Sequence, residues 1–239
     1  MITLYGAGSG FGLPEASPFV TKTEVQLKMA NIPYRKERGT PSEGPKGQLP
    51  FIDDDGARIG DSTFIRAHLE KKYGIDLNAH LEPRQRAEAW AIERMVENHF
   101  TPTWVYGRWM IPENFVKGPA HFFDMAPEPV REKLRADALV RVGEGLRAQG
   151  PNRHAPEEIV WLGEKSLSAL SALLGNRQHI MGDRPCWEDA TVFAALAGAL
   201  TPFFDFPLRR SAESYPNLVA YTTRMMQEYY PEHAWMAAA

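Results

Sequence analysis

Two short segments place polar side chains at the predicted starts of helices, where a bound anion would be stabilised. Ser17 precedes Pro18 and a stretch of helical pattern, and Asp61-Ser62 precede a second such stretch. These residue types favour the first positions of a helix, and at Asp61-Ser62 the free N–H groups and the positive end of the helix dipole could hold a carboxylate. The same residues could equally act as plain helix caps, so the pattern indicates either an anion site or two ordinary caps.

An extended segment lies between these two helix starts: Gly47-Gln48-Leu49-Pro50-Phe51-Ile52. A proline that opens a strand cannot donate to the sheet ladder, and a cis bond before it would turn the preceding backbone outward. The N–H and C=O of Leu49 could then pair with an extended peptide ligand. A cis Pro50 is therefore our hypothesis for this sheet edge.

Other candidate chemistries fail on their spacing. The glycine-rich loop over residues 6–12 places Phe11 where a dinucleotide fingerprint requires its third glycine, and Ser9 follows Ala7 where a nucleophile elbow requires glycine. The histidines show no metal-ligand spacing, so we expect no metal. The single cysteine, Cys186, precedes a predicted helix without a neighbouring histidine, which favours a capping or packing residue over a nucleophile.

Length, charge and cysteine content narrow the function classes. The chain has 239 residues, enough for two domains, and its net charge of −3 is too balanced for a nucleic-acid partner. One cysteine excludes an internal disulfide and favours a reducing compartment, so we expect a cytoplasmic protein. The start lacks the pattern of a signal peptide, and the apolar run over 190–200 is too short to cross a bilayer. No membrane partner is expected.

The periodicity predicts two different architectures in the two parts of the chain. Residues 1–76 read as β-α-β-β-β-α, an α/β domain in which Asp54-Asp55-Gly56 forms a hairpin turn. Residues 83–239 read as an all-helical domain, with turns rich in proline and glycine between its helices. The predicted helices of this second domain cover residues 83–110, 127–149, 155–175, 186–200 and 215–229.

Several motifs in this order carry a resemblance to a known family. They are Ser17-Pro18-Phe19, Asn31-Ile32-Pro33-Tyr34, the segments 46–52 and 61–65, the segment 182–190, and Tyr215-Pro216-Asn217-Leu218. In order and spacing they resemble the glutathione transferases, with a thioredoxin-like domain followed by a helical domain. The long first loop, Lys22-Thr23-Glu24 and the segment 189–193 look closest to the branch that includes the metaxins and the failed-axon-connections protein.

The resemblance implies a ligand and its site. Glutathione would lie extended along the sheet edge as a co-substrate, its cysteinyl backbone paired with Leu49 beside Pro50. Its γ-glutamyl carboxylate would lie at Asp61-Ser62, and Lys46 or Gln48 would meet its glycine carboxylate.

The resemblance also implies how the thiol is activated. Ser17 matches the position whose hydroxyl donates to the thiolate in serine-type members. Its alternative is to cap its own helix, and Tyr5, after the first strand, is a reserve candidate. A pocket for a hydrophobic electrophile would lie between the domains, lined by Phe11, Phe19, Trp104, Tyr106 and Trp109.

Three functions remain open at this point. The leading one is an enzyme that adds the glutathione thiolate to a small hydrophobic electrophile. The alternative is a non-catalytic binding or scaffold protein of the same fold. A thiol reductase is weaker, because that chemistry in this fold normally needs a cysteine where Ser17 stands. Family members commonly pair across the first domain and the first long helix, here 82–110, so we expect a homodimer.

Overall fold

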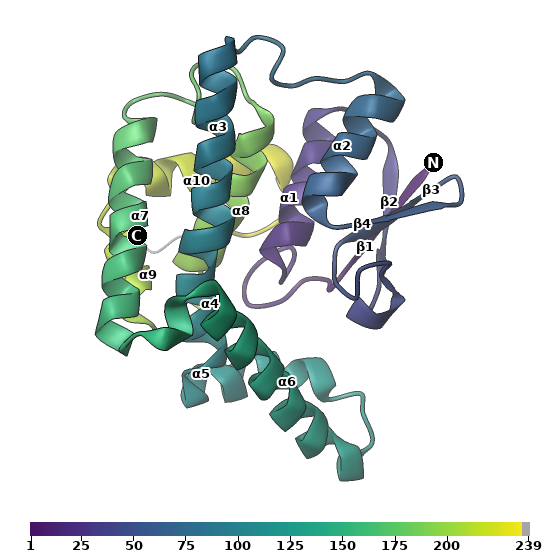
Figure 1. The fold of residues 1–239 in the computed structure, drawn as a ribbon, viewed down its shortest axis with the longest axis vertical. Coiled ribbons are helices and arrows are strands. Elements are labelled where there is room, and N and C mark those ends of the chain that lie inside the picture. Colours follow the sequence, from purple (N-terminus) through teal and green to yellow (C-terminus); the bar gives the residue numbers. More distant parts are fainter. Residues whose placement is uncertain (236–239) are drawn as a thin grey trace.

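The computed structural model describes residues 1–235, and its first part is a mixed sheet with two helices on one face (Figure 1). The strand order is β2-β1-β3-β4, with β1 parallel to β2 and antiparallel to β3. The elements in chain order are β1 (Ile2–Gly6), α1 (Pro18–Met29), β2 (Tyr34–Arg38), the 3-10 turn η1 (Pro41–Glu43), β3 (Phe51–Asp54), β4 (Ala57–Gly60) and α2 (Ser62–Tyr73).

Local sequence explains where these elements begin and turn. Helix α1 has Pro18 as its first residue, and Asn31, at φ 53°, follows its end in the left-handed conformation that asparagine tolerates. The hairpin between β3 and β4 turns at Asp55 (φ 57°) and Gly56 (φ 89°). Two successive left-handed residues define the type I′ turn that an Asp-Gly pair favours, so the predicted hairpin is confirmed.

Side-chain alternation along the sheet separates a core face from a second face. Ile2 and Leu4 of β1 and Ile52 of β3 pack against α1 and α2 in a buried cluster that also contains Val20, Leu27, Ile32, Ile65 and Leu69. Tyr5 and Phe51 point to the opposite face because successive strand residues alternate. Their rings stack there with centroids 4.3 Å apart, and Arg58 lies over them.

The remainder of the described chain is helical, as expected. It contains α3 (Pro83–Met95), the π-helical segment η2 (Val96–Phe100), α4 (Thr101–Trp109), α5 (Pro112–Lys117), η3 (Pro119–Phe123), α6 (Glu128–Gln149), η4 (Pro151–Arg153), α7 (Pro156–Leu174), α8 (Trp187–Leu200), α9 (Pro207–Glu213) and α10 (Pro216–Tyr229). None of the helices within residues 1–235 is long and apolar enough to cross a membrane.

The sequence interpretation was wrong at three short helices. The segments that begin at Pro112, Pro119 and Pro207 are short helices, although their prolines and glycines were interpreted as turns. Proline is well tolerated at the first helical position because the N–H that it lacks has no intrahelical partner there. In addition, the predicted helix over 83–110 is interrupted by the π-helical turn of η2.

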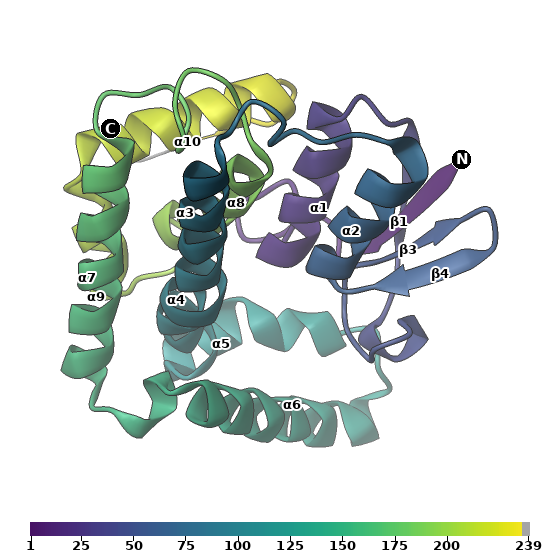
Figure 2. The same cartoon turned by 45° about the horizontal axis from the view of Figure 1, so that its top comes forward.

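Helix α8 is the buried centre of the molecule. All fourteen of its residues are buried, and it packs against α1 of the first part and against α3, α9 and α10. Figure 2 shows α8 between α3 and α1, while α5 and α6 lie along the lower edge, away from α10. An all-round apolar helix must lie in the interior, which explains the apolar run that the sequence analysis found over 190–200.

A cluster of charged side chains joins the sheet part to the helical part. Lys22 of α1 is 1% exposed, and its ammonium lies 3.0 Å from Glu93 of α3 and 2.6 Å from Glu97. Arg66 of α2 donates to Glu93 at 3.2 Å and to Glu188 of α8 at 2.7 Å. The ammonium and the guanidinium lower the pKa of Glu93 against the opposing effect of its burial. The ionised groups therefore compensate one another inside the interface.

Asp189 organises the start of α8. Its carboxylate accepts hydrogen bonds from the backbone N–H of Ile180 (2.8 Å), the backbone N–H of Cys186 (2.9 Å) and the hydroxyl of Tyr221 (2.9 Å). The Cys186 thiol is buried and donates to the same carboxylate at 3.2 Å. Burial and the neighbouring Asp189 carboxylate raise the pKa of this thiol. Cys186 is therefore a packing residue rather than a nucleophile.

We expect Asp189→Ala to destabilise the protein by about 3 kcal/mol or more, because four buried donors lose the carboxylate that accepts from them. Cys186→Ser should change stability by no more than about 1 kcal/mol, in the stabilising direction, because a hydroxyl makes the same donation and also caps the helix better than a thiol. Urea denaturation of the two variants measures both effects. A large loss of stability in Cys186→Ser would contradict this account.

Candidate functional site

Ser17 is the residue before the first turn of α1, and its hydroxyl does not cap that helix. Its backbone is extended (φ −94°, ψ 122°), no side-chain cap hydrogen bond forms, and its carbonyl accepts from the N–H of Thr21 at 3.0 Å. The side chain is half-buried. The capping alternative for Ser17 therefore does not describe this structure, and its hydroxyl is free to donate to a ligand at the positive end of α1.

Glu15 fixes the backbone that leads into Ser17. Its carboxylate, 1% exposed, accepts hydrogen bonds from the N–H groups of Ala7 (3.2 Å), Gly8 (3.0 Å) and Ser17 (3.1 Å). Lys36 of β2 forms an ion pair with it at 3.1 Å. Burial raises the pKa of Glu15, and the Lys36 ammonium and the N–H donors oppose that effect. The sequence analysis missed this residue, since no pattern distinguishes it from a surface glutamate.

The extended segment before β3 has the geometry that the sequence predicted. The peptide bond between Leu49 and Pro50 is cis, which confirms the hypothesis. The carbonyl of Pro50 accepts from the N–H of Asp61 at 3.1 Å, whereas the N–H and C=O of Leu49 take part in no hydrogen bond among residues 1–235. Leu49 is half-buried, and its unpaired backbone N–H and C=O lie at the edge of the sheet, beside the start of α2.

Asp61 and Ser62 form the start of α2, beside the unpaired backbone of Leu49. Asp61 caps the helix through Oδ1, which accepts from the N–H of Thr63 at 2.9 Å, and its Oδ2 accepts from the Gln48 amide at 3.2 Å. The capping alternative is therefore correct for the Asp61 side chain. Asp61 also has φ 79°, a left-handed backbone that is strained for a residue other than glycine and that is found most often at ligand sites.

The two predicted ligands for the glycine carboxylate lie in the same region. Gln48 is exposed and reaches Asp61, as described above. The Lys46 ammonium lies 3.4 Å from the centroid of the Phe64 ring, in the first turn of α2. The structure thus brings Lys46, Gln48, Leu49, Pro50, Asp61 and Ser62 to one end of the sheet.

Tyr5 lies apart from this group. It points to the sheet face opposite α1 and stacks on Phe51 under Arg58, as the register of β1 with β3 requires. The start of α1 packs on the other face, because Val20 belongs to the cluster beneath α1 and α2. The Tyr5 ring and the start of α1 therefore lie on opposite faces of the sheet.

Phe11 connects the glycine-rich loop to the helical part. Its ring lies 5.0 to 5.4 Å from the centroids of Phe122, Phe203 and Phe204, and its carbonyl accepts from the hydroxyl of Thr201 at 2.6 Å. Its φ of 59° is left-handed. The ring therefore lies between the glycine-rich loop and the helical part, where it fills space by packing.

The other four predicted pocket residues lie in different surroundings. Trp109 packs on Phe122 and therefore joins the Phe11 cluster, with ring centroids 6.3 Å apart. Trp104 is buried against α8, and Tyr106 packs on Phe206. Phe19 is half-buried in the first turn of α1. The structure brings Phe11 and Trp109 into one cluster and does not gather all five around a single cavity.

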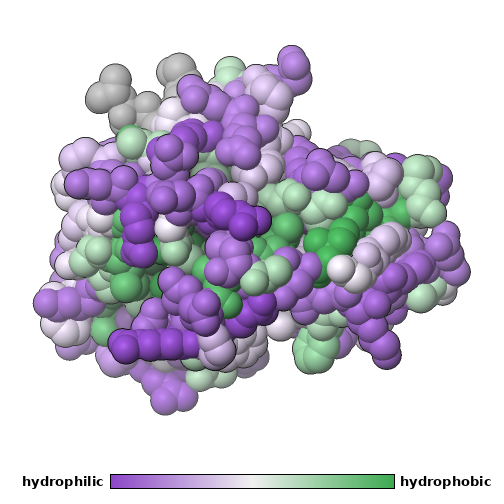
Figure 3. All heavy atoms as spheres, turned by 90° about the horizontal axis from the view of Figure 1, so that it is seen from above, coloured by the Kyte–Doolittle hydropathy of each residue, from purple (hydrophilic) through white to green (hydrophobic). Residues whose placement is uncertain are grey.

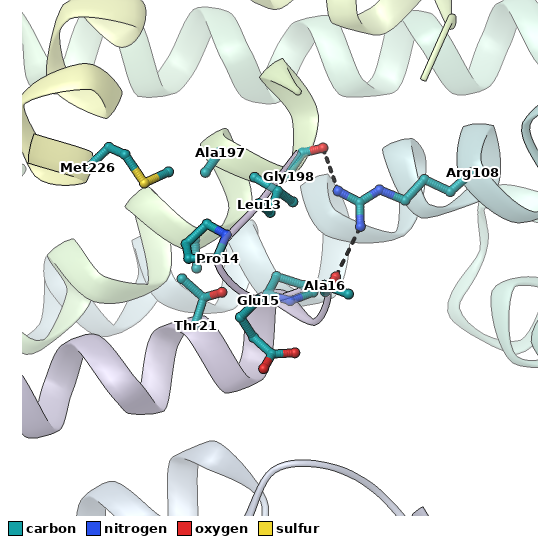
Figure 4. A pocket seen from close by; sticks show the side chains of 11 residues that line it. Leu13, Pro14, Glu15, Ala16, Thr21, Arg108, Ala197, Gly198 and Met226 are labelled. Carbon is teal, nitrogen blue, oxygen red and sulfur yellow. Dashed lines mark hydrogen bonds between the residues drawn. The ribbon is translucent and has the colours of Figure 1, made fainter. Parts of the chain in front are cut away.

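Arg108 of α4 lies between Trp104, the loop before Ser17, and α8. Its guanidinium donates to the carbonyls of Ala16 at 3.2 Å and Gly198 at 2.8 Å (Figure 4). It separates two cavities of about 10 Å³ each, one lined by residues 13–16 and the other by Trp104 and Phe204. Each cavity has room for about one water molecule.

A larger hollow of about 480 Å³ lies at the opposite end of α1. It is lined by Lys28, Met29, Asn31, Leu77, Pro185, Glu228 and Tyr229. Figure 3 faces this end of the molecule, where hydrophobic patches are set in a mostly hydrophilic surface. The hollow contains none of the predicted site residues. Among residues 1–235, no group of three His, Cys, Asp or Glu side chains could hold a metal.

Comparison with known proteins identifies the family. A model of the glutathione S-transferase N-terminal domain matches residues 18–114, and a model of the C-terminal domain of the same family matches residues 163–225. The chain therefore belongs to the glutathione S-transferase family.

Its relatives include an enzyme and proteins that are not named as enzymes. The isoprene-epoxide glutathione S-transferase of Rhodococcus sp. (strain AD45) is 30% identical over 96% of this chain and 99% of its own length. Failed axon connections of Drosophila melanogaster is also 30% identical, over 92% of this chain, and the match spans 56% of that protein. Mouse metaxin-1 is 26% identical over 95% of this chain and 75% of its own length.

Solved structures agree on the fold. The beta-etherase LigF from Sphingobium sp. strain SYK-6 superposes with a TM-score of 0.67 at 18% identity, over 97% of this chain and 99% of its own. A glutathione S-transferase from Methylobacterium radiotolerans, in complex with glutathione sulfonate, superposes with a TM-score of 0.61 at 17% identity, over 100% of this chain and 96% of its own. These matches show the thioredoxin-like and helical arrangement.

We expect Glu15→Gln to loosen the loop that precedes Ser17, because a carboxylate that accepts three N–H donors is replaced by a neutral amide. Amide hydrogen exchange at Ala7, Gly8 and Ser17 should accelerate at least tenfold, with a loss of stability of about 2 kcal/mol. Glu37→Gln, a partly exposed position on β2, is the matched control and should leave these amides unchanged. Unaltered exchange in Glu15→Gln would show that the carboxylate does not hold the loop.

Proposed function

We propose that the protein is a glutathione transferase that activates the glutathione thiol for attack on a small apolar electrophile. The observation that carries this proposal is the Ser17 hydroxyl, which leaves its own helix uncapped and lies at the positive end of α1. A serine used only for structure would satisfy the free N–H groups of the first turn.

The sheet edge of the protein carries groups that are complementary to those of the tripeptide glutathione. The free N–H and C=O of Leu49 suit the backbone of the cysteinyl residue, and the start of α2 at Ser62 suits the γ-glutamyl carboxylate. Lys46 and Gln48 lie next to that helix start, where the Lys46 ammonium can meet a second carboxylate. An extended peptide with a carboxylate at each end matches this set of donors.

The chemical step needs a thiolate at neutral pH. A free thiol has a pKa near 8.5, and a charge-assisted hydrogen bond from Ser17 of about 1.5 to 3 kcal/mol lowers that value by roughly one to two units. The end of α1 adds about 0.3 to 1 kcal/mol. The thiolate then attacks an electrophilic carbon; in an epoxide the new carbon–sulfur bond forms as a ring carbon–oxygen bond breaks, and the resulting alkoxide takes a proton from solvent. The protein supplies proximity without a covalent intermediate. The name of the Rhodococcus relative makes a small epoxide the first electrophile to test.

A scaffold function is the second candidate, and one observation favours it. Phe11 and its aromatic neighbours fill the space between the glycine-rich loop and α4, where the cavities next to Arg108 hold about 10 Å³ each. A scaffold would not bind glutathione, whereas a transferase must move Phe11 aside to admit an electrophile. The relatives named metaxin and Failed axon connections are consistent with this candidate.

Isothermal titration with glutathione separates the two candidates. We expect binding in the micromolar to millimolar range and, for Ser17→Ala, a turnover of an epoxide at least tenfold lower, with an apparent thiol pKa raised by about one unit or more. Affinity for S-methylglutathione should not change in Ser17→Ala, because that ligand has no thiol. The absence of any binding heat in the wild-type protein would favour the scaffold.

A further inference from the structure

Arg108 is a buried cation without an acidic partner. Its side chain is 4% exposed, and no carboxylate of the described chain lies within ion-pair distance. Its two hydrogen bonds go to neutral carbonyls, and its Nε has no partner. Burial lowers the pKa of Arg108 to about 9, so the guanidinium is still protonated at neutral pH. A buried, uncompensated cation is costly unless an anion comes near it.

The surroundings of Arg108 are apolar and lower the local dielectric. The rings of Trp104, Phe204 and Phe11 lie 4.3, 5.1 and 5.5 Å from its central carbon. The rings contribute weak cation–π attraction and exclude water, which would otherwise screen the charge. The field of Arg108 therefore extends further than that of an exposed arginine.

This charge acts on the start of α1. The guanidinium donates to the carbonyl of Ala16, which belongs to the peptide unit that contains the Ser17 nitrogen. Figure 4 shows the guanidinium directed at this carbonyl while the Glu15 carboxylate points away from it. The positive charge thus lies one peptide unit from Ser17, at the start of α1.

The other charges near this helix start are largely paired. Glu15 lies against Lys36, which also pairs with Glu24 at 2.6 Å, and these two carboxylates partly oppose a bound anion. Arg38 of β2 donates to the carbonyl of Ala7, and His233 lies 3.0 Å from the carbonyl of Gly12. Arg209 of α9 lines one cavity beside Arg108 and is paired with Glu213. Arg38 and Arg108 both lack an acidic partner within the described residues, but Arg38 is exposed whereas Arg108 is buried.

We propose that Arg108 is a positioning residue that lowers the pKa of the bound glutathione thiol, by holding an unpaired positive charge one peptide unit from Ser17. The inference rests on the proposed function. Its chemistry is an electrostatic linkage: a buried cation and an incoming thiolate stabilise each other, so the proton leaves the thiol at a lower pH. No bond is formed to Arg108, and the proton passes to solvent.

Ultraviolet difference titration of the thiolate in the glutathione complex tests this proposal. In Arg108→Gln, which retains a donor but loses the charge, we expect the thiol pKa to rise by about one unit. In Arg108→Lys the rise should be smaller than in Arg108→Gln, because the ammonium keeps part of the charge although the same burial also lowers its pKa. Arg209→Gln is the matched control from the same cavity and should shift the pKa by no more than about 0.3 units.

Affinity for S-methylglutathione reports whether the tripeptide site remains intact in each variant. An equal thiol pKa in wild type and Arg108→Gln, with that affinity retained, overturns the proposal. An equal rise in Arg108→Lys and Arg108→Gln also overturns it, because the effect would then come from the hydrogen bonds. If Arg108→Gln does not fold, Arg108→Met, which also removes the charge, replaces it in both comparisons. Failure of the wild-type protein to bind glutathione is a different result, which refutes the proposed function itself.

Discussion

The carboxylate of Glu15 is the constraint on which the candidate site depends. It accepts N–H groups from both arms of the loop between β1 and α1, so one side chain closes the loop on itself. The helical part then holds the same loop from outside, through Arg108 at Ala16 and Thr201 at Phe11. Ser17 therefore has a fixed place, although its own side chain makes no helix cap.

The same region contains both unpaired polar groups and tightly packed aromatic rings. At the sheet edge, the backbone N–H and C=O of Leu49 have no hydrogen-bond partner among residues 1–235. The space between the glycine-rich loop and the helical part is occupied by rings, with Phe11 inserted among Phe122, Phe203 and Phe204. The backbone of Phe11 is left-handed, and this strained geometry is typical of segments that move at functional sites.

Local signals in the sequence were sufficient for most of the fold. The Asp-Gly hairpin, the cis Pro50 and the caps at Asp61 depend on residues close in the chain, and their chemistry is visible there. The short helices that begin at Pro112 and Pro207 were missed because proline both opens helices and ends them.

The long-range charges of the site were not predictable. Glu15 and Arg108 occur among many other charged residues, and only the folded chain shows that both are buried. Their partners are backbone groups or residues distant in the sequence, which leave no periodic signal. In the same way, the sequence placed Tyr5 near the site, whereas the strand register turns it to the far face.

The ionic cluster between the two parts of the chain has a consequence for how the molecule melts. Lys22, Arg66, Glu93 and Glu188 come from α1, α2, α3 and α8, and the ion pairs between the two parts break if the parts separate. Separation would also expose to water the apolar surface that α1 and α8 bury against each other. The chain should thus lose its structure in a single cooperative transition, with no half-folded species populated on the way.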